Sequence, residues 1–515
     1  MNLITLLSSL LICLASTQAE NILMITMCGT KSHKIPFMAL ANGLISRGHH
    51  ITFLSGFKPE VQHNGLEEVT PTPFVNYIQN YMDWDLVGAR YEGKSPIPVW
   101  RALRYPAEAC DSLLSDSATI DTLMAKKFDL AILDGAFPEC ALGLVHRLAM
   151  PFMYINTVGL YTGSLAMAGN PNVYAITPHV LTALTQSMDF FQRFQNAITH
   201  ILAELLHKYC VSQVHAVLQT HLGRHVPHPY TMAHNVSFIL QNGHASITYP
   251  RPFYPHVAEI ACIHCRPAGT LPRELEDFMS SARTGVIYYS MGSSVRTAKM
   301  PDDFYKTMVS VFAQLSEYHV LWKWEGNATQ LAGLTPNVRL SAWLPQQDIL
   351  GHRRLKAFIT HGGLLSMYEA IYHAMPMVML PVFCDHDVNV AKATADGYAV
   401  HVPLDAHLTK AQMLHAILKV IHNGKYRRAI RAKRALFLDQ PAPPLETAIF
   451  WTEYTLRHKG ATHLLAPDRN LGFVAYHSLD VISACFVGIL LLLLLLHAGL
   501  KYLRRMLLRG KAKRD

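Results

Sequence analysis

Little glycine follows the first predicted strand of this chain. The segment from Met27 to His33, directly after an apolar run at 22–26, contains a single glycine. A nicotinamide-binding fold needs G-x-G-x-x-G at this place, because its glycines let the backbone approach the pyrophosphate. The sequence therefore argues against a nucleotide-sugar epimerase or another nicotinamide-dependent enzyme.

Cysteine is also sparse, with nine in 515 residues. Cys13 and Cys485 fall in apolar segments near the two ends, and the remaining seven are an odd number without the dense pattern of a disulfide framework. Cys262 and Cys265 form a C-x-x-C, but no second pair or histidine ligand set follows at zinc spacing. We interpret this C-x-x-C as structural.

Charged residues make up only 16% of the chain, and the net charge of +9 is unevenly placed. The tail at 501–515 carries seven basic residues against one acid, so it holds most of the net charge. The folded part needs no nucleic acid to explain its charge. No internal repeat or low-complexity segment is visible apart from a leucine run at 490–496.

Both ends of the chain are apolar enough to interact with a membrane. Residues 1–19 have an apolar centre and end in Thr17-Gln18-Ala19, the small-residue pattern of a signal-peptide cleavage site. Residues 481–500 contain no acidic residue, lysine or arginine, and a helix of that length covers a hydrocarbon core of about 30 Å. By the positive-inside rule the basic tail at 501–515 is cytosolic, so everything before the span is lumenal.

Two short patterns suggest a compartment. Lys511 and Lys513 resemble a dilysine retrieval signal of endoplasmic reticulum membrane proteins, although basic residues there also anchor anionic lipid, and both can hold. Asn235-Val-Ser and Asn327-Ala-Thr are glycosylation sequons that a lumenal location would expose.

The chain is long enough for two domains, each with its own core. A segment rich in proline and glycine at 266–272 is the predicted linker, between domains at 20–265 and 273–460. From Met153 to roughly Ala258 we expect helical patches and polar turns without a chemistry motif. A helix around Thr447 to His458 is expected to pack back onto the first domain.

The first domain begins with a β-loop-α-β pattern. Ile22 to Thr26 reads as a buried parallel strand, and His33 lies in the loop that opens onto the ligand crevice. Asp134 ends a second strand at 130–133, and strand-end residues of parallel strands can face each other. Alone, His33 would more often be a capping or surface residue, and Asp134 with the next glycine is also ordinary turn chemistry.

The second domain contains the stretch that organises the chain, at 343–389. A strand at 358–360 leads through His361, Gly362 and Gly363 to a helix at 364–374 and a further strand at 376–380. The start of that helix offers free N–H groups and the positive end of its dipole to an anion. The unit is therefore built to receive a phosphate.

Polar and aromatic residues surround this phosphate turn. The Trp343 ring offers a face on which a base could stack, and the Gln346 amide could hydrogen-bond to the edge of that base. The Glu369 carboxylate could accept hydrogen bonds from two sugar hydroxyls. Asp385 and His386 follow a strand end, where they could contact further hydroxyls.

Taken together, W-x-P-Q, H-G-G, S-x-x-E and the closing D-H resemble the donor signature of the UDP-glycosyltransferase superfamily, which includes the UDP-glucuronosyltransferases. The run HGGLLSMYEAIYH most resembles arthropod members. The resemblance implies two Rossmann-like α/β domains facing a crevice, the GT-B fold. The sequence adds to this fold the C-terminal transmembrane helix predicted at 481–500. The first domain would bind the acceptor and the second the donor.

The resemblance also implies roles for single residues. His33 would be the catalytic base and Asp134 its partner. In the donor site, Trp343 would stack on uracil, Gln346 would contact the uridine, Ser293, His361, Ser366 and the helix start after Gly363 would contact the diphosphate, Glu369 the ribose, and Asp385 and His386 the transferred sugar. Without the resemblance, a helix-entry serine explains Ser293 equally well. We expect metal-independent transfer with the UDP-sugar as co-substrate and no cofactor.

Two positions depart from the family pattern. Leu365 stands where many members carry asparagine, and His386 stands where glucose and glucuronic acid users mostly carry glutamine and some galactose users carry histidine. The expected function is inverting transfer of glucose, galactose or glucuronic acid to a hydroxyl of a small lipophilic acceptor, as in detoxification. The alternative is a non-catalytic UDP-sugar-binding membrane subunit, and a homo-oligomer is possible.

Overall fold

The structure is a computed structural model, and it describes residues 19–59, 63–82, 84–160, 162–327, 331–465 and 471–511. It forms two compact units, Met1–Leu465 and Ala466–Asp515. The predicted signal peptide, except Ala19, and the predicted dilysine residue Lys513 lie outside the described residues.

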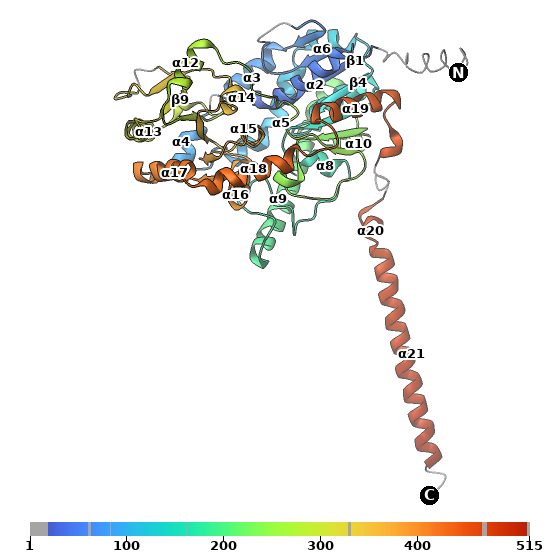
Figure 1. The fold of residues 1–515 in the computed structure, drawn as a ribbon. Helices are drawn as coiled ribbons and strands as arrows, with labels where there is room; N and C mark the ends of the chain where they lie inside the picture. Colours follow the sequence, from blue (N-terminus) through green and yellow to red (C-terminus); the bar gives the residue numbers. More distant parts are fainter. Residues whose placement is uncertain are drawn as a thin grey trace, which may run out of the picture. The chain divides into compact units, whose positions relative to one another are not determined.

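The first unit contains two sheets, and each pairs its strands in parallel (Figure 1). Parallel sheets are covered on both faces, and the central strands here are accordingly mostly apolar and buried on both sides. In order across the first sheet the strands are β3 (Leu66–Val69), β2 (His50–Leu54), β1 (Asn21–Ile25), β4 (Leu130–Asp134), β5 (Phe152–Asn156), β6 (Phe238–Gln241) and β7 (Val257–Glu259). In the second sheet they are β10 (Val338–Ser341), β9 (His319–Lys323), β8 (Val286–Ser290), β11 (Leu355–Thr360), β12 (Met377–Met379) and β13 (Ala399–His401).

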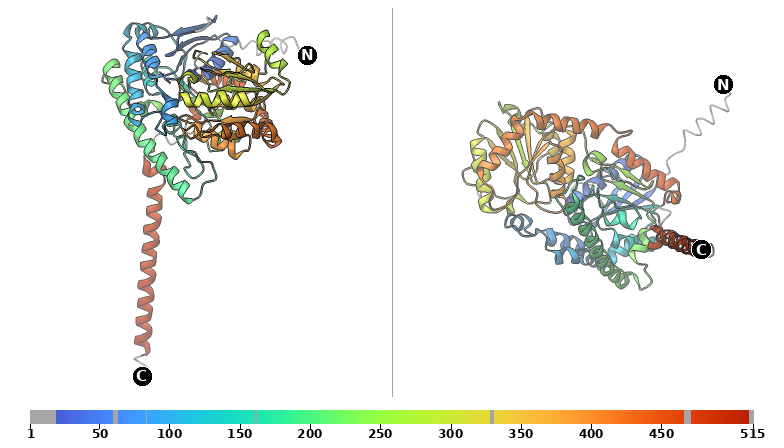
Figure 2. Two further views of the ribbon diagram at one scale, coloured as in Figure 1. Left: turned by 90° about the vertical axis from the view of Figure 1, so that its left-hand side faces the viewer. Right: turned by 90° about the horizontal axis from the view of Figure 1, so that it is seen from below.

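Helices connect the strands and surround both sheets, as the two views in Figure 2 show. We call the part built on β1 to β7 the first half and the part built on β8 to β13 the second half. The helices that the following sections use are α2 (Lys34–Ser46), α5 (Val99–Leu114), α7 (Glu139–Leu148), α9 (Phe190–Leu222), α12 (Arg273–Ser281), α13 (Asp302–Gln314), α14 (Gln346–Leu350), α15 (Leu364–Tyr372), α16 (His386–Ala395), α17 (Lys410–His422), α18 (Gly424–Leu438) and α19 (Pro444–Arg457).

In each sheet the chain adds strands first on one side of a central pair and then on the other side. The central pair is β1 and β4 in the first sheet, and β8 and β11 in the second. At such switch points the loops leave the strand ends to opposite faces and open a crevice. The predicted site residues His33, Asp134, Ser293 and His361 all follow or end these four strands.

Two features tie distant parts of the first half together. A disulfide between Cys110 of α5 and Cys140 of α7 closes the loop that contains β4. Helix α19 packs on α2, β6 and β7, as we predicted from sequence (Figure 1). Ala448 and Ile449 of α19 join the buried apolar cluster on that face of the sheet.

The expectation of only helical patches and turns from Met153 to roughly Ala258 is wrong. This stretch includes β5 and β6, which are buried on both faces, and the 33-residue helix α9. The two strands are apolar runs of four and three residues that end in Asn156 and Gln241, without alternation. A buried helix segment shares this pattern. Because β5 was not predicted, the sequence analysis missed a residue at its end that contributes to the site.

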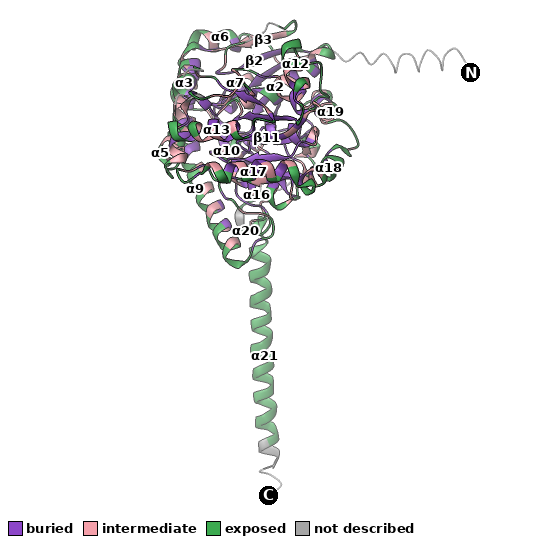
Figure 3. Cartoon of the chain, turned by 60° about the vertical axis from the view of Figure 1, so that its left-hand side comes forward, coloured by how far each residue is buried: buried purple, intermediate pink, exposed green. Residues whose placement is uncertain are grey.

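The second unit is dominated by one long helix, α21 (Leu479–Lys511), which is exposed along its described length (Figure 3). Residues 479–507 form an apolar stretch long enough to cross a membrane. The predicted span at 481–500 lies within this helix, and the helix continues into the basic tail as far as Lys511.

Candidate active site

A cavity of about 790 Å³ opens between the carboxyl ends of the two sheets. This volume suits a ligand of several rings. The cavity brings together residues that sequence analysis placed in separate motifs. His33 lines it from the first half, and Ser293, Trp343, Gln346, His361, Gly363, Ser366, Glu369, Asp385 and His386 line it from the second.

His33 and Asp134 are in direct contact on the wall of the first half. His33 Nδ1 lies 3.0 Å from Asp134 Oδ2, and the aspartate is 1% exposed behind it. Parallel pairing of Ile25 with Leu133 brings Thr26 beside Asp134, and Thr26 Oγ1 donates to Asp134 Oδ2 at 3.0 Å. Because Nδ1 donates to the carboxylate, neutral His33 carries its lone pair on Nε2.

Thr157 completes this group, and the sequence analysis missed it. Its Oγ1 lies 2.5 Å from His33 Nδ1 and donates to Asp134 Oδ1 at 3.1 Å. Thr157 directly follows β5, the neighbour of β4. Had β5 been predicted, its strand-end position would have marked Thr157 as a candidate.

Burial and nearby groups shift the pKa of His33 in opposite directions. Burial alone lowers its pKa and is the largest single influence, but Cys28 and Asp134 favour the charged ring. Their combined effect holds the pKa of His33 well above its usual value. The geometry is that of a histidine oriented and made more basic by a buried carboxylate.

On the opposite wall, two glycines leave room for His361. A Cβ on Gly363 would lie 2.4 Å from His361 Nε2, and one on Gly292, whose φ is +74°, would lie 2.5 Å from the same ring. Burial, reinforced by the positive charge of Lys323, lowers the pKa of His361 to about 3. His361 is therefore a neutral imidazole at the start of α15.

Trp343 and the residues of α14 and α15 form the far end of the cavity. Trp343 is 69% exposed, and Lys31 Nζ lies over its ring at 5.7 Å from the centroid. This exposure leaves the ring accessible for stacking on a ligand. Gln346 Nε2 donates to Ser366 Oγ at 3.0 Å and to Glu369 Oε2 at 2.6 Å. A second partner of the Glu369 carboxylate is His264, whose Nε2 lies 3.1 Å from its other oxygen, Oε1.

Asp385 and His386 lie where the two walls approach each other. Burial raises the pKa of the Asp385 carboxyl, while a hydrogen bond from Asn389 and the nearby His33 oppose the shift. His386 Nδ1 accepts the backbone N–H groups of Val382 and Phe383, each at 3.3 Å, so its proton is on Nε2. Burial, reinforced by His361 and Arg90, lowers the pKa of His386 well below its usual value.

Lys323 and His264 are two further residues of the cavity wall that the sequence analysis missed. Lys323 ends β9, and its Nζ donates to the Gly292 carbonyl at 2.9 Å and contacts Glu325 at 2.5 Å. Its position at the end of a strand was a usable signal, because the carboxyl ends of parallel strands line the ligand crevice. His264 precedes the predicted linker and carries no motif that would mark it.

The two sequon asparagines lie elsewhere. Asn235 is exposed after a short helix of the first half, and Asn327 is exposed after β9. The threonine of the second sequon lies outside the described residues. Neither asparagine lines the cavity.

Comparisons with known proteins agree with this geometry. The model of the family described as "UDP-glucoronosyl and UDP-glucosyl transferase" matches residues 25–514. UDP-glucuronosyltransferase 2A1 of Rattus norvegicus is 32% identical over 490 residues, which is 90% of each chain. UDP-glucosyltransferase 2 of Dactylopius coccus is 30% identical over 452 residues, which is 87% of this chain and 86% of that protein.

Solved structures show the same architecture. The glycosyltransferase SnogD from Streptomyces nogalater superposes with a TM-score of 0.57 at 19% identity, over 85% of this chain and 100% of that one. This likeness, together with the two parallel sheets, confirms the predicted GT-B fold. With the family match spanning nearly the whole sequence, the chain belongs to the UDP-glycosyltransferase family.

Proposed function

We propose that this protein is an inverting glycosyltransferase that moves a hexose from a UDP-sugar to a hydroxyl of a small lipophilic acceptor. The hexose is glucose, galactose or glucuronic acid. The proposal rests chiefly on one observation: His33, in contact with buried Asp134, lines the same cavity as the residues of the donor motif.

In the proposed reaction His33 acts as general base. Its Nε2 takes the proton of the acceptor hydroxyl while that oxygen attacks the anomeric carbon of the sugar. The bond from that carbon to the β-phosphate oxygen breaks, and UDP leaves. Asp134 stabilises the imidazolium that forms and holds the ring by Nδ1, and Thr157 contacts the same nitrogen.

Negative charge that develops on the leaving diphosphate meets donors of the second half. His361, Ser293 and Ser366, with the free N–H groups at the start of α15, would receive it. As a neutral imidazole, His361 would donate a hydrogen bond, and the cation of Lys323 lies close enough to depress its pKa. We expect transfer to persist when divalent metals are chelated.

The proposal is tested by offering UDP-glucose, UDP-galactose and UDP-glucuronic acid in parallel to membranes that contain the protein, with a phenolic acceptor. We expect product from at least one donor, and loss of product with unchanged UDP binding in His33→Ala. UDP binding without product from any donor would favour the non-catalytic UDP-sugar-binding subunit. Full turnover in His33→Ala would refute the base assignment.

We also propose that the protein is a single-pass type I membrane protein of the endoplasmic reticulum. A cleaved signal peptide at 1–19, the span at 481–500 and the basic tail at 501–515 support a lumenal active site. In that compartment Asn235 and Asn327 would be glycosylated. An enzyme that removes N-linked glycans should increase the gel mobility of the wild type, and each Asn→Gln variant should lose one glycan.

A further inference from the structure

The connection between the two halves carries a histidine that reaches into the donor site. His264 lies five residues after β7, between Cys262 and Cys265, which form a disulfide. Its imidazole lines the cavity and is buried against the second half. There, His264 Nε2 lies 3.1 Å from Glu369 Oε1. A residue that precedes the second sheet thus contacts a carboxylate of helix α15 in the second half.

His264 and Gln346 hold the two oxygens of Glu369 separately. Gln346 Nε2 donates to Oε2 at 2.6 Å, and His264 Nε2 approaches Oε1. A carboxylate has about four acceptor directions, so two donors leave directions free on both oxygens. Donors on separate oxygens fix the rotation of the carboxylate about its last bond. Because Glu369 lines the cavity, its remaining acceptor directions are then held in one orientation there.

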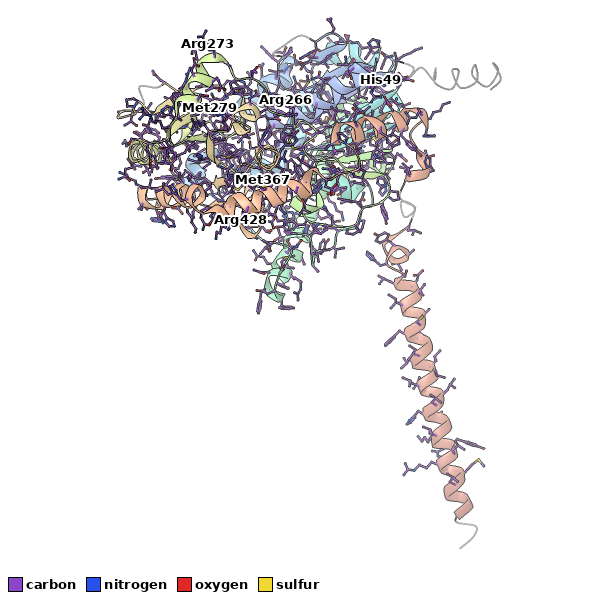
Figure 4. All side chains as sticks on the ribbon, in the orientation of Figure 1. His49, Arg266, Arg273, Met279, Met367 and Arg428 are labelled. Atoms are coloured by element: carbon purple, nitrogen blue, oxygen red, sulfur yellow. A yellow bond between two sulfur atoms is a disulfide. The ribbon has the colours of Figure 1, made fainter. Side chains whose placement is uncertain are left out.

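The backbone around His264 is fastened to α14. The Gln347 side chain donates to the His264 carbonyl at 3.2 Å and accepts the Arg266 N–H at 2.8 Å. Arg266 places two guanidinium nitrogens 2.6 and 2.8 Å from the carboxylate oxygens of Asp348. In the view of Figure 4, Arg266 lies between Met279 of the second half and His49 of the first. These bonds fix the position of His264 relative to Gln346, which is the first residue of α14.

Among the described residues, only one of the two ring nitrogens of His264 has a polar partner. Within the described part of the chain, His264 Nδ1 is buried and has no hydrogen-bond partner. A buried polar atom without a partner destabilises a fold. With Nδ1 unpaired, the Nε2 proton directed at Glu369 is the polar interaction that the ring provides.

From this geometry we propose that His264 is a positioning residue that orients Glu369 for the ribose hydroxyls of a uridine nucleotide. The inference rests on the proposed function, in which Glu369 binds the ribose. It adds that the segment between the two halves, and not the donor motif alone, sets the affinity for the nucleotide. His264 acts through Glu369 and takes no part in proton transfer from the acceptor.

The test compares UDP with 2′,3′-dideoxy-UDP, which lacks both ribose hydroxyls. Calorimetric binding to the full chain in detergent should show wild type preferring UDP by about 10-fold or more, because hydrogen bonds to a charged group are lost. In His264→Ala, UDP should bind about 10-fold more weakly and the preference should fall below about 3-fold. KM for the UDP-sugar should rise, while kcat and the acceptor KM change by less than about 2-fold.

Two further variants separate positioning from folding. His264→Gln keeps a side-chain N–H donor and should restore much of the preference for UDP. His352→Gln is the matched control, because His352 Nε2 lies 3.3 Å from Glu276 outside the cavity. It should leave both affinities unchanged.

Four results would overturn the proposal. Equal weakening of UDP and 2′,3′-dideoxy-UDP in His264→Ala would show a merely structural effect. Unchanged UDP affinity in that variant would show that Glu369 needs no support from His264. A wild type that binds both nucleotides equally would refute the ribose assignment of Glu369 itself, and a wild type that binds neither would refute the proposed function.

Discussion

The Asp134→Asn variant tests whether His33 must be oriented by Asp134 in order to act as a general base. Asp134 accepts four contacts: Ala136 N and Thr157 Oγ1 at Oδ1, and Thr26 Oγ1 and His33 Nδ1 at Oδ2, at 3.0 to 3.1 Å. Asparagine has the same shape but only one acceptor oxygen. If that oxygen keeps the backbone contact to Ala136, the NH₂ group faces His33 and the histidine must turn its Nδ1 lone pair toward it.

The consequence is a proton on the wrong nitrogen. With Nδ1 as acceptor, neutral His33 carries its proton on Nε2, which then cannot take the acceptor proton. A hydrogen bond to a charged group contributes roughly 1.5–3 kcal/mol, which alone corresponds to roughly 10- to 150-fold in kcat/KM. We therefore expect kcat/KM to fall by at least about 10-fold.

The pH profile checks the cause of that fall. A general base acts when neutral, so kcat/KM rises with pH through the pKa of His33. Asp134 is among the groups that raise that pKa, so in Asp134→Asn the rising limb should move to lower pH. UDP binding should not change, because Asp134 does not line the cavity. A variant with a wild-type rate and an unmoved pH limb would refute the reasoning.

Four other predictions concern the donor site and the tail. Trp343→Ala should weaken UDP binding by about 1–3 kcal/mol through lost stacking and leave the melting temperature unchanged, because the ring is 69% exposed; calorimetry and thermal unfolding measure the two effects. Gly363→Ala should displace His361, abolish UDP binding and lower the free energy of unfolding by about 1–3 kcal/mol, and a variant that still binds UDP would contradict the close contact. His386→Gln should change the ratio of rates with UDP-galactose and UDP-glucose, and an unchanged ratio would remove His386 from sugar selection. Truncation after Arg509 should release the protein from the endoplasmic reticulum, which microscopy of a tagged chain would show.

Much of the second half could be predicted because its motif is local. The strand, the glycine turn and the helix at 358–372 follow one another in sequence, so their order and spacing fix the geometry. His361 and Gly363 are neighbours in the chain as well as in space. The predicted contact between His33 and Asp134 needed the resemblance in addition, since 101 residues separate them.

What could not be predicted depends on tertiary packing. Thr157 belongs to the His33 group only because β5 pairs with β4, and β5 itself has no periodicity that separates a strand from a buried helix. His264 comes to Glu369 through side-chain bonds from Gln347, which no sequence spacing encodes. The domain boundaries stay a prediction, and so do the roles of the site residues.

The docking of α19 has a consequence for protein engineering. Ile449 fills the space beside Gly43, where a Cβ would lie 2.7 Å from its Cδ1, and Trp451 stacks on Phe238 at 4.3 Å. The fold of the first half is therefore discontinuous in the gene, since a C-terminal segment completes it. A chimera that exchanges the second half at the predicted linker should stay soluble only when residues 444–457 come from the same parent as residues 20–265.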